Sequence, residues 1–197
     1  MKTLEKNVIL ITGAGMGLGL ATAMEAAALG AKLVLVDYNE EALQKTKSDL
    51  LNDYPEVEIL TIKADVSKEE EVEAYVTETI EKFGQIDGFY NNAGIEGKQA
   101  SITAYDIDVF KKVIDINLLG VYYGLRYVLP HMEEKKYGRI VNVASVGGIR
   151  GVMNQMPYVA SKHAVSGMTK NTALEYARHG ITSNAIAPGA ILTPMVA

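Results

Sequence analysis

Short apolar runs alternate with longer helical patterns along almost the whole chain. The continuous apolar run at residues 8–12 predicts a strand that is buried on both faces of a sheet, and residues 32–36 predict a second buried strand. Further strands are predicted at 57–63, 86–91, 139–144 and 182–187, and helices at 19–29, 40–52, 67–83, 105–134 and 157–178. Because parallel strands need a crossover connection, usually a helix, this alternation predicts a doubly wound parallel α/β sheet of the Rossmann type, with helices on both faces.

Two of the predicted helices carry further local signals. Ser67 and Glu70 have the spacing of a capping box, which predicts that the third helix starts there. The segment 105–134 is long for one helix, and we expect it to bend near Gly120 or Pro130.

The composition is that of an ordinary globular domain. With 197 residues, 48% of them hydrophobic and 22% charged, the chain can form one domain with a proper core. Its net charge of −5 gives no reason to expect nucleic acid or an anionic membrane as a partner. The lack of cysteine excludes disulfides and fits a reducing cytoplasm, and the scattered histidines show no ligand spacing, so we expect no metal.

A glycine-rich segment, Thr12-Gly-Ala-Gly-Met-Gly-Leu-Gly19, lies between the first predicted strand and the first predicted helix. Glycines in this position permit a tight turn and let a pyrophosphate approach the backbone amides at the positive end of the helix. Flexible loops and methyltransferase sites also contain such turns. The order strand, turn, helix favours a nucleotide-binding site.

Asp37 ends the second predicted strand, eighteen residues after Gly19. A carboxylate at this place accepts hydrogen bonds from both hydroxyls of an adenosine ribose and repels a 2′-phosphate. No Arg or Lys directly follows Asp37, and Met16 in the turn is neutral. The pattern therefore favours NAD over NADP, the alternative being an ordinary solvated aspartate.

Polar or small residues also follow the next two strands. Asp65-Val66 follows the third strand, where Asp65 is placed either to accept from the amino group of an adenine or to precede the Ser67 cap. The segment Asn91-Asn-Ala-Gly94 follows the fourth strand, where small residues leave room for a cofactor while the amides brace neighbouring strands. A plain turn has the same composition.

Tyr158 and Lys162 are four residues apart, about one helical turn, so both side chains can face one pocket. An ammonium beside a phenol stabilises the phenolate and lowers the pKa of the phenol, which makes tyrosine a better acid/base near neutral pH. Ser145, thirteen residues before Tyr158, supplies a hydroxyl that can polarise a carbonyl. Taken alone, the Tyr-x-x-x-Lys spacing is common and mostly accidental.

Taken together, these motifs resemble the short-chain dehydrogenase/reductase family. The matching residues are Thr12, Gly13, Gly17, Gly19, Asp65, the segment 91–94, Asn117, Ser145, Tyr158, Lys162, Pro188, Gly189 and Thr193, in the order of the family. The resemblance implies an oxidoreductase that transfers a hydride between NAD(H) and a secondary alcohol or ketone, working as a homo-oligomer, a tetramer. A dinucleotide-binding sensor without catalysis need not retain Ser145, Tyr158 and Lys162.

The resemblance also implies a role for each matching residue. Tyr158 moves the proton to or from the substrate oxygen, Ser145 holds that oxygen, and Lys162 assists Tyr158 and binds the nicotinamide ribose. Asn117 positions a water in the proton relay, unless it is a mid-helix asparagine that bonds locally. The expected cofactor contacts are Gly13, Met16, Gly17, Leu18, Gly19, Asp37, Asp65, Val66, Asn92, Ala93, Gly94, Tyr158, Lys162, Pro188, Gly189, Ile191 and Thr193.

The substrate is indicated less strongly. The loops 95–99 and 146–151 are expected to rim the pocket, and Gln155 is expected to contact the substrate with Ser145 and Tyr158. These loops resemble those of cyclic-diketone reductases within the family, so we expect a secondary and cyclic ketone or alcohol. A sugar or polyol is the main alternative.

The sequence ends on an apolar stretch, residues 190–197, directly after the last predicted strand. Members of the family continue with a helical lid and a further strand. We therefore expect residues 1–197 to form a single NAD-binding Rossmann-type domain that lacks its C-terminal portion.

Overall fold

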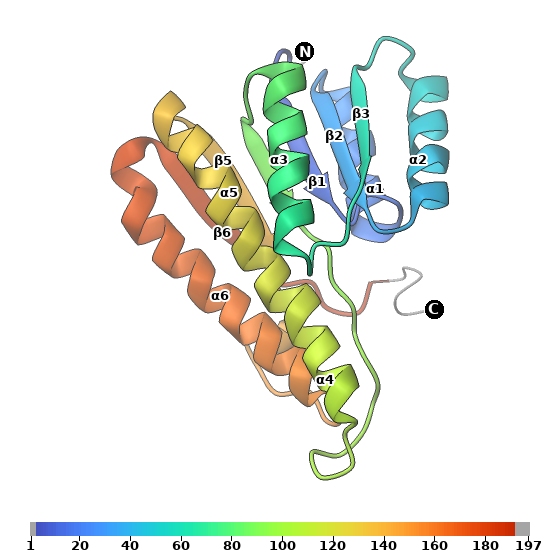
Figure 1. Cartoon of the computed structure of the whole chain (residues 1–197), viewed down its shortest axis with the longest axis vertical. Helices are drawn as coiled ribbons and strands as arrows, with labels where there is room; N and C mark the ends of the chain where they lie inside the picture. Colours follow the sequence, from blue (N-terminus) through green and yellow to red (C-terminus); the bar gives the residue numbers. More distant parts are fainter. Residues whose placement is uncertain (1–2, 192–197) are drawn as a thin grey trace.

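The computed structural model describes residues 3–191 and contains one parallel sheet with the strand order β3-β2-β1-β4-β5-β6 (Figure 1). The strands are β1 (Val8–Thr12), β2 (Lys32–Asp37), β3 (Ile59–Lys63), β4 (Gly88–Asn91), β5 (Gly138–Val143) and β6 (Ile181–Ile186). The chain moves outward from β1 through β2 to β3 and then returns to the other side of β1 as β4. This reversal confirms the predicted doubly wound sheet and creates a crevice at the carboxyl ends of β1 and β4.

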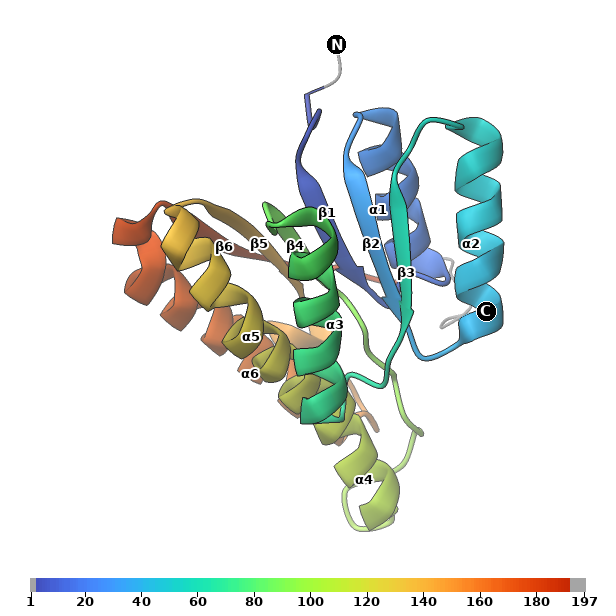
Figure 2. The same ribbon diagram turned by 45° about the horizontal axis from the view of Figure 1, so that its top comes forward.

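Helices cover the sheet on both faces. The helices α3 (Glu69–Phe83), α5 (Gly120–Lys135) and α6 (Met156–Tyr176) lie on one face, and α1 (Gly17–Ala28) and α2 (Glu40–Asp53) lie on the other (Figures 1 and 2). Each face has its own core of buried apolar side chains. Val72, Leu125 and Val165 pack on the first face, while the small Ala23 and Ala27 bring α1 close to the second.

The long helical segment after β4 differs from the prediction. It consists of α4 (Ile107–Ile114), a π-helical turn (Asp115–Leu119) and α5, without a break between them. A Cβ on Gly120 would lie 2.9 Å from Val66 Cγ2 and 3.0 Å from its carbonyl oxygen, so the glycine lets the helix approach the end of β3. The irregular part of this helical segment is thus the π turn directly before Gly120. Such turns are often found at functional sites.

The predicted capping box at Ser67 is wrong. The helix α3 begins at Glu69 with Lys68 at its N-cap, and no side chain caps it there. The Ser67 hydroxyl instead donates to Asp65 Oδ1 over 2.7 Å, and Glu71 Oε2 accepts from the Asp65 amide over 2.7 Å. The polar groups of this turn thus hold the end of β3 rather than the start of the helix.

None of the helices in the described part of the chain is long and apolar enough to cross a membrane. Residues 8–24, which carry no charge, form β1, the glycine-rich turn and the first two-thirds of α1.

Candidate active site

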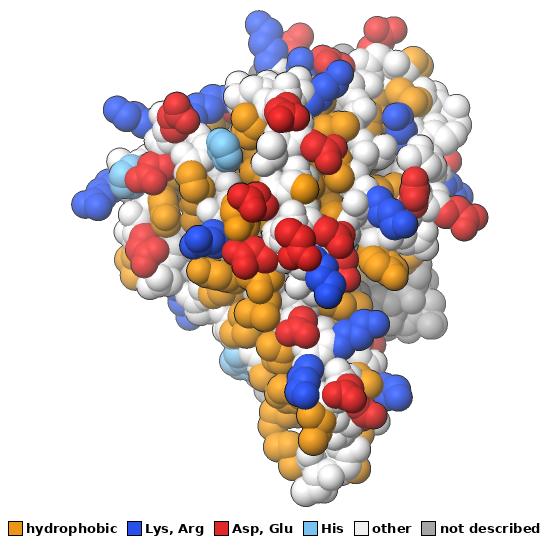
Figure 3. Space-filling view, in the orientation of Figure 1, with side chains coloured by type: hydrophobic (Ala, Val, Ile, Leu, Met, Phe, Trp, Pro, Cys, Tyr) orange, Lys and Arg blue, Asp and Glu red, His pale blue; other side chains and the backbone are white. Residues whose placement is uncertain are grey.

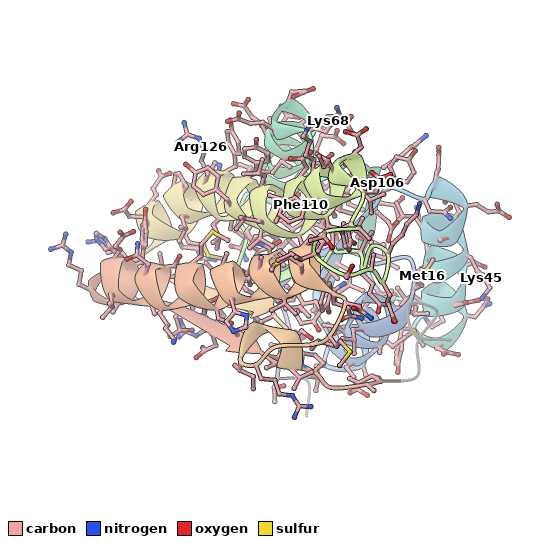
Figure 4. The ribbon with its side chains drawn as sticks, turned by 90° about the horizontal axis from the view of Figure 1, so that it is seen from below. Met16, Lys45, Lys68, Asp106, Phe110 and Arg126 are labelled. Carbon is pink, nitrogen blue, oxygen red and sulfur yellow. The ribbon has the colours of Figure 1, made fainter. Side chains whose placement is uncertain are left out.

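A cavity of about 460 Å³ lies in the crevice at the carboxyl ends of β1 and β4. Viewed from below, Met16 lies at the start of α1, between Lys45 on α2 and Phe110 on α4 (Figure 4). The residues that line the cavity are Gly13, Met16, Gly17, Leu18, Asp37, Tyr38, Ala64, Asp65, Val66, Asn92, Ala93, Gly94, Ile95, Lys112, Ile116, Val143, Ala144, Ser145, Tyr158, Lys162, Pro188, Gly189 and Ile191. Most of the residues predicted from the sequence to bind a cofactor therefore line one cavity.

The glycine-rich turn uses its glycines for two different purposes. Gly13 and Gly17 have φ angles of 64° and 56°, in the left-handed region that side chains other than glycine rarely adopt. A Cβ on Gly13 would also lie 2.8 Å from Asn92 Nδ2. A Cβ on Gly19 would overlap the carbonyl oxygen of Gly13, so Gly19 lets α1 pack against the turn. Gly19 was predicted to contact the cofactor, but it does not line the cavity.

The carboxylate of Asp37 is held in place by backbone amides. Its Oδ2 accepts from the Gly15 amide over 2.8 Å, and its Oδ1 accepts from the Asn39 amide over 2.9 Å. A Cβ on Gly15 would lie 3.0 Å from Asp37 Oδ2, so only glycine allows this approach. The side chain is thereby fixed at the edge of the cavity, with lone pairs left for a ligand.

The residues at the end of β3 line the cavity as well. Asp65 Oδ1 accepts from both the amide and the hydroxyl of Ser67, over 3.0 and 2.7 Å. Asp65 thus holds the turn with one oxygen and also lines the cavity, where its contact with an adenine stays a prediction.

The end of β4 is braced against β1 by side-chain amides. Asn92 Nδ2 donates to the carbonyl oxygens of Thr12 and Gly13 over 2.9 and 3.2 Å. The Thr12 hydroxyl accepts from the amides of Asn92 and Ala93 over 3.0 and 3.1 Å. These bonds fix the carboxyl ends of the two strands relative to each other, where the crevice opens.

Ser145 and Tyr158 lie on either side of Gly147. Ser145 follows β5 and is buried, and its Oγ accepts from the Gly147 amide over 3.1 Å. A Cβ on Gly147 would lie 3.5 Å from Tyr158 Cδ1 and 3.6 Å from Ser145 Oγ. The absence of a side chain at Gly147 thus leaves the serine hydroxyl and the tyrosine ring facing the same small space.

Lys162 lies one turn after Tyr158 on α6, is 3% exposed, and places its Nζ 5.7 Å from the centre of the Tyr158 ring. The same Nζ donates to the carbonyl oxygen of Val143 over 2.7 Å. Burial lowers the pKa of Lys162 from 10.5 to about 8, because desolvation penalises the ammonium. The lysine is therefore a poorly solvated cation that gains from any further acceptor in the cavity.

We expect Lys162→Met to stabilise the nucleotide-free protein at pH 7 by about 2 kcal/mol, since about 3 kcal/mol of desolvation is removed and about 1 kcal/mol of hydrogen bonding is lost. The folded protein binds its Lys162 proton less tightly than the unfolded chain. The free energy of unfolding should therefore rise in the wild type between pH 8 and 10.5, the two pKa values of this lysine. Urea denaturation across that pH range should show that the difference in free energy of unfolding between the wild type and Lys162→Met becomes smaller. A constant difference would contradict the assignment of a buried charge to Lys162.

Asn117 lies at the centre of the π turn and is completely buried. Its Oδ1 accepts from the Ile95 amide and its Nδ2 donates to the Ile95 carbonyl oxygen, both over 2.8 Å. The Nδ2 also donates to Ser161 Oγ over 3.3 Å. The interpretation as a locally bonded mid-helix asparagine is therefore wrong, because the side chain clamps a loop that lies beside the cavity.

Gly94 brings Asn117 close to Lys162. A Cβ on Gly94 would lie 3.1 Å from Asn117 Oδ1 and 3.4 Å from Lys162 Nζ. Asn117 does not itself line the cavity. Of the two remaining predicted contacts, Gln155 lies just before α6 and bonds to Glu96, and Thr193 lies outside the described residues.

Several residues that line the cavity were not predicted from the sequence: Tyr38, Ala64, Lys112, Ile116, Val143 and Ala144. Most of them are immediate neighbours of predicted residues at the strand ends, so their positions could have been inferred. Lys112 is the exception. Its one signal is that it precedes Ile116 by one helical turn on a helix leading to Asn117.

Comparison with known proteins agrees with this arrangement. The family model for short chain dehydrogenases matches residues 7–197. Levodione reductase of Leifsonia aquatica is 58% identical over 190 residues, which are 96% of this chain and 71% of that protein. Cyclohexanol dehydrogenase of Acinetobacter sp. (strain SE19) is 40% identical over 193 residues, which are 98% of this chain and 76% of that protein.

Solved structures agree with the sequence comparison. A crystal structure of levodione reductase has a TM-score of 0.97 and 57% identity, with 98% of this chain and 75% of that chain covered. A crystal structure of NAD⁺-bound xylitol dehydrogenase has a TM-score of 0.92 and 39% identity, with 95% and 72% covered. The family resemblance that the motifs indicate is thus confirmed.

Proposed function

Because the chain belongs to the short chain dehydrogenase family, and is thus an oxidoreductase that transfers a hydride between a nicotinamide dinucleotide and a secondary alcohol or ketone, we propose that its substrate is cyclic and its cofactor NAD(H). The observation that carries this proposal is the convergence of Ser145, Tyr158 and Lys162 on one cavity. A nucleotide sensor has no need of these three side chains together.

The described residues fit the dinucleotide. The turn at Gly13 and Gly17, both with left-handed φ angles, lines the cavity at the N-terminus of α1, where a pyrophosphate is stabilised. Asp37 offers fixed carboxylate oxygens to ribose hydroxyls at one end of the cavity. Lys162 offers a poorly solvated ammonium at the other end. When bound, the nicotinamide supplies or accepts the hydride.

The chain's own residues handle the proton. Tyr158 donates its hydroxyl proton to the substrate oxygen during reduction and takes it back during oxidation. Ser145, whose Oγ already accepts from the Gly147 amide, has its own proton free to donate to the same substrate oxygen. Lys162 binds the nicotinamide ribose and assists Tyr158. Asn117 fixes the loop at Ile95 beside the cavity, and its part in holding a relay water stays a prediction.

The preference for NAD over NADP is supported by the fixed position of Asp37. A 2′-phosphate bound there would face a carboxylate that two backbone amides hold in place. Tyr38, which follows Asp37, and Met16, in the glycine-rich turn, also line the cavity. Neither carries a positive charge that would offset the repulsion. We therefore propose that the carboxylate of Asp37 disfavours the phosphorylated cofactor.

A cyclic substrate is supported by the two relatives named above, one of which is a cyclohexanol dehydrogenase. Aliphatic and glycine residues beside Ser145, such as Val146 and Gly147, suit a compact ring. A polyol is the second candidate, supported by the similarity to xylitol dehydrogenase and by the polar pair Glu96 and Gln155.

A screen of NADH and NADPH consumption over cyclic ketones and ketoses tests the proposal. We expect cyclohexanone-type substrates to be reduced with NADH at least tenfold faster than ketoses, and NADPH to support less than a tenth of the NADH rate. Equal rates with the two cofactors would contradict the role of Asp37. A preference for ketoses would favour the polyol alternative.

We also propose that residues 1–197 form one cytoplasmic domain, and that the protein is a homo-oligomer, a tetramer as in the family resemblance. The exposed apolar face supports an oligomer, since Tyr122 on α5 is 45% exposed and Leu174 on α6 is 83% exposed. Hydrophobic side chains gather over α5 and continue down to α4 (Figure 3).

A further inference from the structure

Ser161 is a buried residue whose hydroxyl neither lines the cavity nor takes part in the chemistry proposed above. Serines within helices can bond to a carbonyl oxygen of the preceding turn, and Ser161 Oγ donates in this way to the Tyr158 carbonyl oxygen over 2.8 Å. It also accepts from Asn117 Nδ2 over 3.3 Å, a contact with a residue 44 positions earlier in the chain. Ser161 therefore joins the π turn to the helix that carries Tyr158.

The hydrogen bonds around Ser161 have a fixed direction. Asn117 uses its Oδ1 to accept from the Ile95 amide and its Nδ2 to donate to the Ile95 carbonyl oxygen. Because an NH₂ group can only donate, Ser161 Oγ must be the acceptor of the second N–H of Asn117. The single hydroxyl proton of Ser161 is then left for the Tyr158 carbonyl oxygen. The bonds thus lead in one direction from Ile95, which lines the cavity, to the backbone of Tyr158.

The contact between Asn117 and Ser161 is shielded from solvent. Both residues are 0% exposed, so bulk water does not replace a lost partner. Among residues 3–191, their bond is the one side-chain hydrogen bond between the π turn and α6. A Cβ on Gly94 would lie 3.1 Å from Asn117 Oδ1 and 3.4 Å from Lys162 Nζ, so Asn117 is packed close to the lysine of the site. The polar connection of Asn117 to α6 therefore depends on one hydroxyl.

We infer that Ser161 is a positioning residue, which fixes Asn117 relative to Tyr158. The inference rests on the proposed function and adds to it a side chain that touches neither cofactor nor substrate. Without the hydroxyl, the second N–H of Asn117 would be buried with no acceptor, and the amide would have to move to find one. Because the same amide holds Ile95, that movement would loosen the cavity wall next to the proton donor.

Ser161→Ala tests the inference in the NADH-linked reduction of cyclohexanone. We expect kcat to fall about five- to thirtyfold, the effect of one buried N–H without a partner. The dissociation constant of NADH should change less than about twofold, since Ser161 bonds to Asn117 and Tyr158 and does not line the cavity. Ser161→Cys keeps the shape of the side chain with a weaker hydrogen-bonding atom, so its kcat should lie between those of Ser161→Ala and the wild type.

Thr79→Val is the matched control. Thr79 on α3 is also 0% exposed, and its Oγ1 donates to the Tyr75 carbonyl oxygen of the same helix over 2.7 Å. It thus loses a buried hydroxyl with a local helical bond, but one that does not reach Asn117. Its kcat and its affinity for NADH should both equal those of the wild type.

The double variant Asn117→Ala with Ser161→Ala separates positioning from general damage to α6. If Ser161 acts through Asn117, its removal from a protein that already lacks the Asn117 amide should change kcat less than about twofold. Multiplied losses, an unchanged kcat in Ser161→Ala, or a loss of NADH affinity as large as the loss of kcat would overturn the inference while leaving the proposed function intact. Absence of NADH-linked ketone reduction by the wild type would instead overturn the proposed function, and the inference with it.

Discussion

Replacing Tyr158 with phenylalanine is expected to lower kcat for ketone reduction by about 10²- to 10⁴-fold, the usual contribution of a positioned general acid. The change removes one hydroxyl and keeps the ring that packs beside Gly147 and Lys162. The loss corresponds to about 3–5 kcal/mol of transition-state stabilisation. Because many other residues line the proposed nucleotide site, the dissociation constant of NADH should change less than tenfold.

Single-turnover rates with saturating NADH, together with fluorescence titration of NADH, measure the two quantities separately. Tyr137→Phe is the matched control, since Tyr137 lies just before β5, where its ring stacks against Arg139, 4.3 Å from the guanidinium carbon. That variant should retain the wild-type rate. Survival of NADH-linked turnover in Tyr158→Phe at more than a tenth of the wild-type rate would refute the assignment of the proton to Tyr158.

The fold was predictable from the sequence because its signals are local. Uninterrupted apolar runs marked β1 and β2, and the glycine-rich turn marked where α1 begins. The predicted ends differ from the observed ones by about two residues, as at β3, which starts at Ile59 rather than Val57. Errors of this size do not alter which residues reach the carboxyl end of the sheet.

The predictions that failed had two different causes, one local and one tertiary. Ser67 has the pattern of a cap, but Asp65, two residues earlier, competes for its hydroxyl. Asn117 looks like a helical asparagine until the loop at Ile95 is folded against it, 22 residues earlier in the chain. The π turn was not predicted, because no sequence pattern specifies it. Its geometry allows Asn117 to face the loop at Ile95. Such residues are defined by tertiary contacts, which spacing alone does not specify.

Asp87 is the clearest residue of this kind, and its replacement by alanine should lower the free energy of unfolding by about 3–4 kcal/mol. The carboxylate is 3% exposed and lies just before β4. Its Oδ2 accepts from the Val8 amide and from Gln85 Nε2, both over 2.7 Å, and its Oδ1 accepts from Lys135 Nζ over 2.5 Å. One side chain thus ties the starts of β1 and β4 to the end of α5.

The cost arises because alanine leaves partners without an acceptor. The Val8 amide is buried at the start of β1, so losing its partner carries a desolvation penalty. Lys135 is 36% exposed and can turn to water, which limits the loss to less than that of a fully buried ion pair. Asp49→Ala is the matched control, because Asp49 forms an exposed pair with Lys45 at 2.7 Å, worth less than about 1 kcal/mol.

Urea denaturation of both variants gives the comparison, and the rate of ketone reduction by the folded Asp87→Ala protein gives a second one. Asp87 precedes β4, whereas Asn92 and Gly94 follow it, so the carboxylate lies at the opposite end of the strand from the cavity. Stability should therefore fall while kcat stays within about twofold of the wild type. A loss of stability no larger than that of Asp49→Ala would show that water replaces the buried carboxylate, and that the connection between β1, β4 and α5 depends on apolar packing alone.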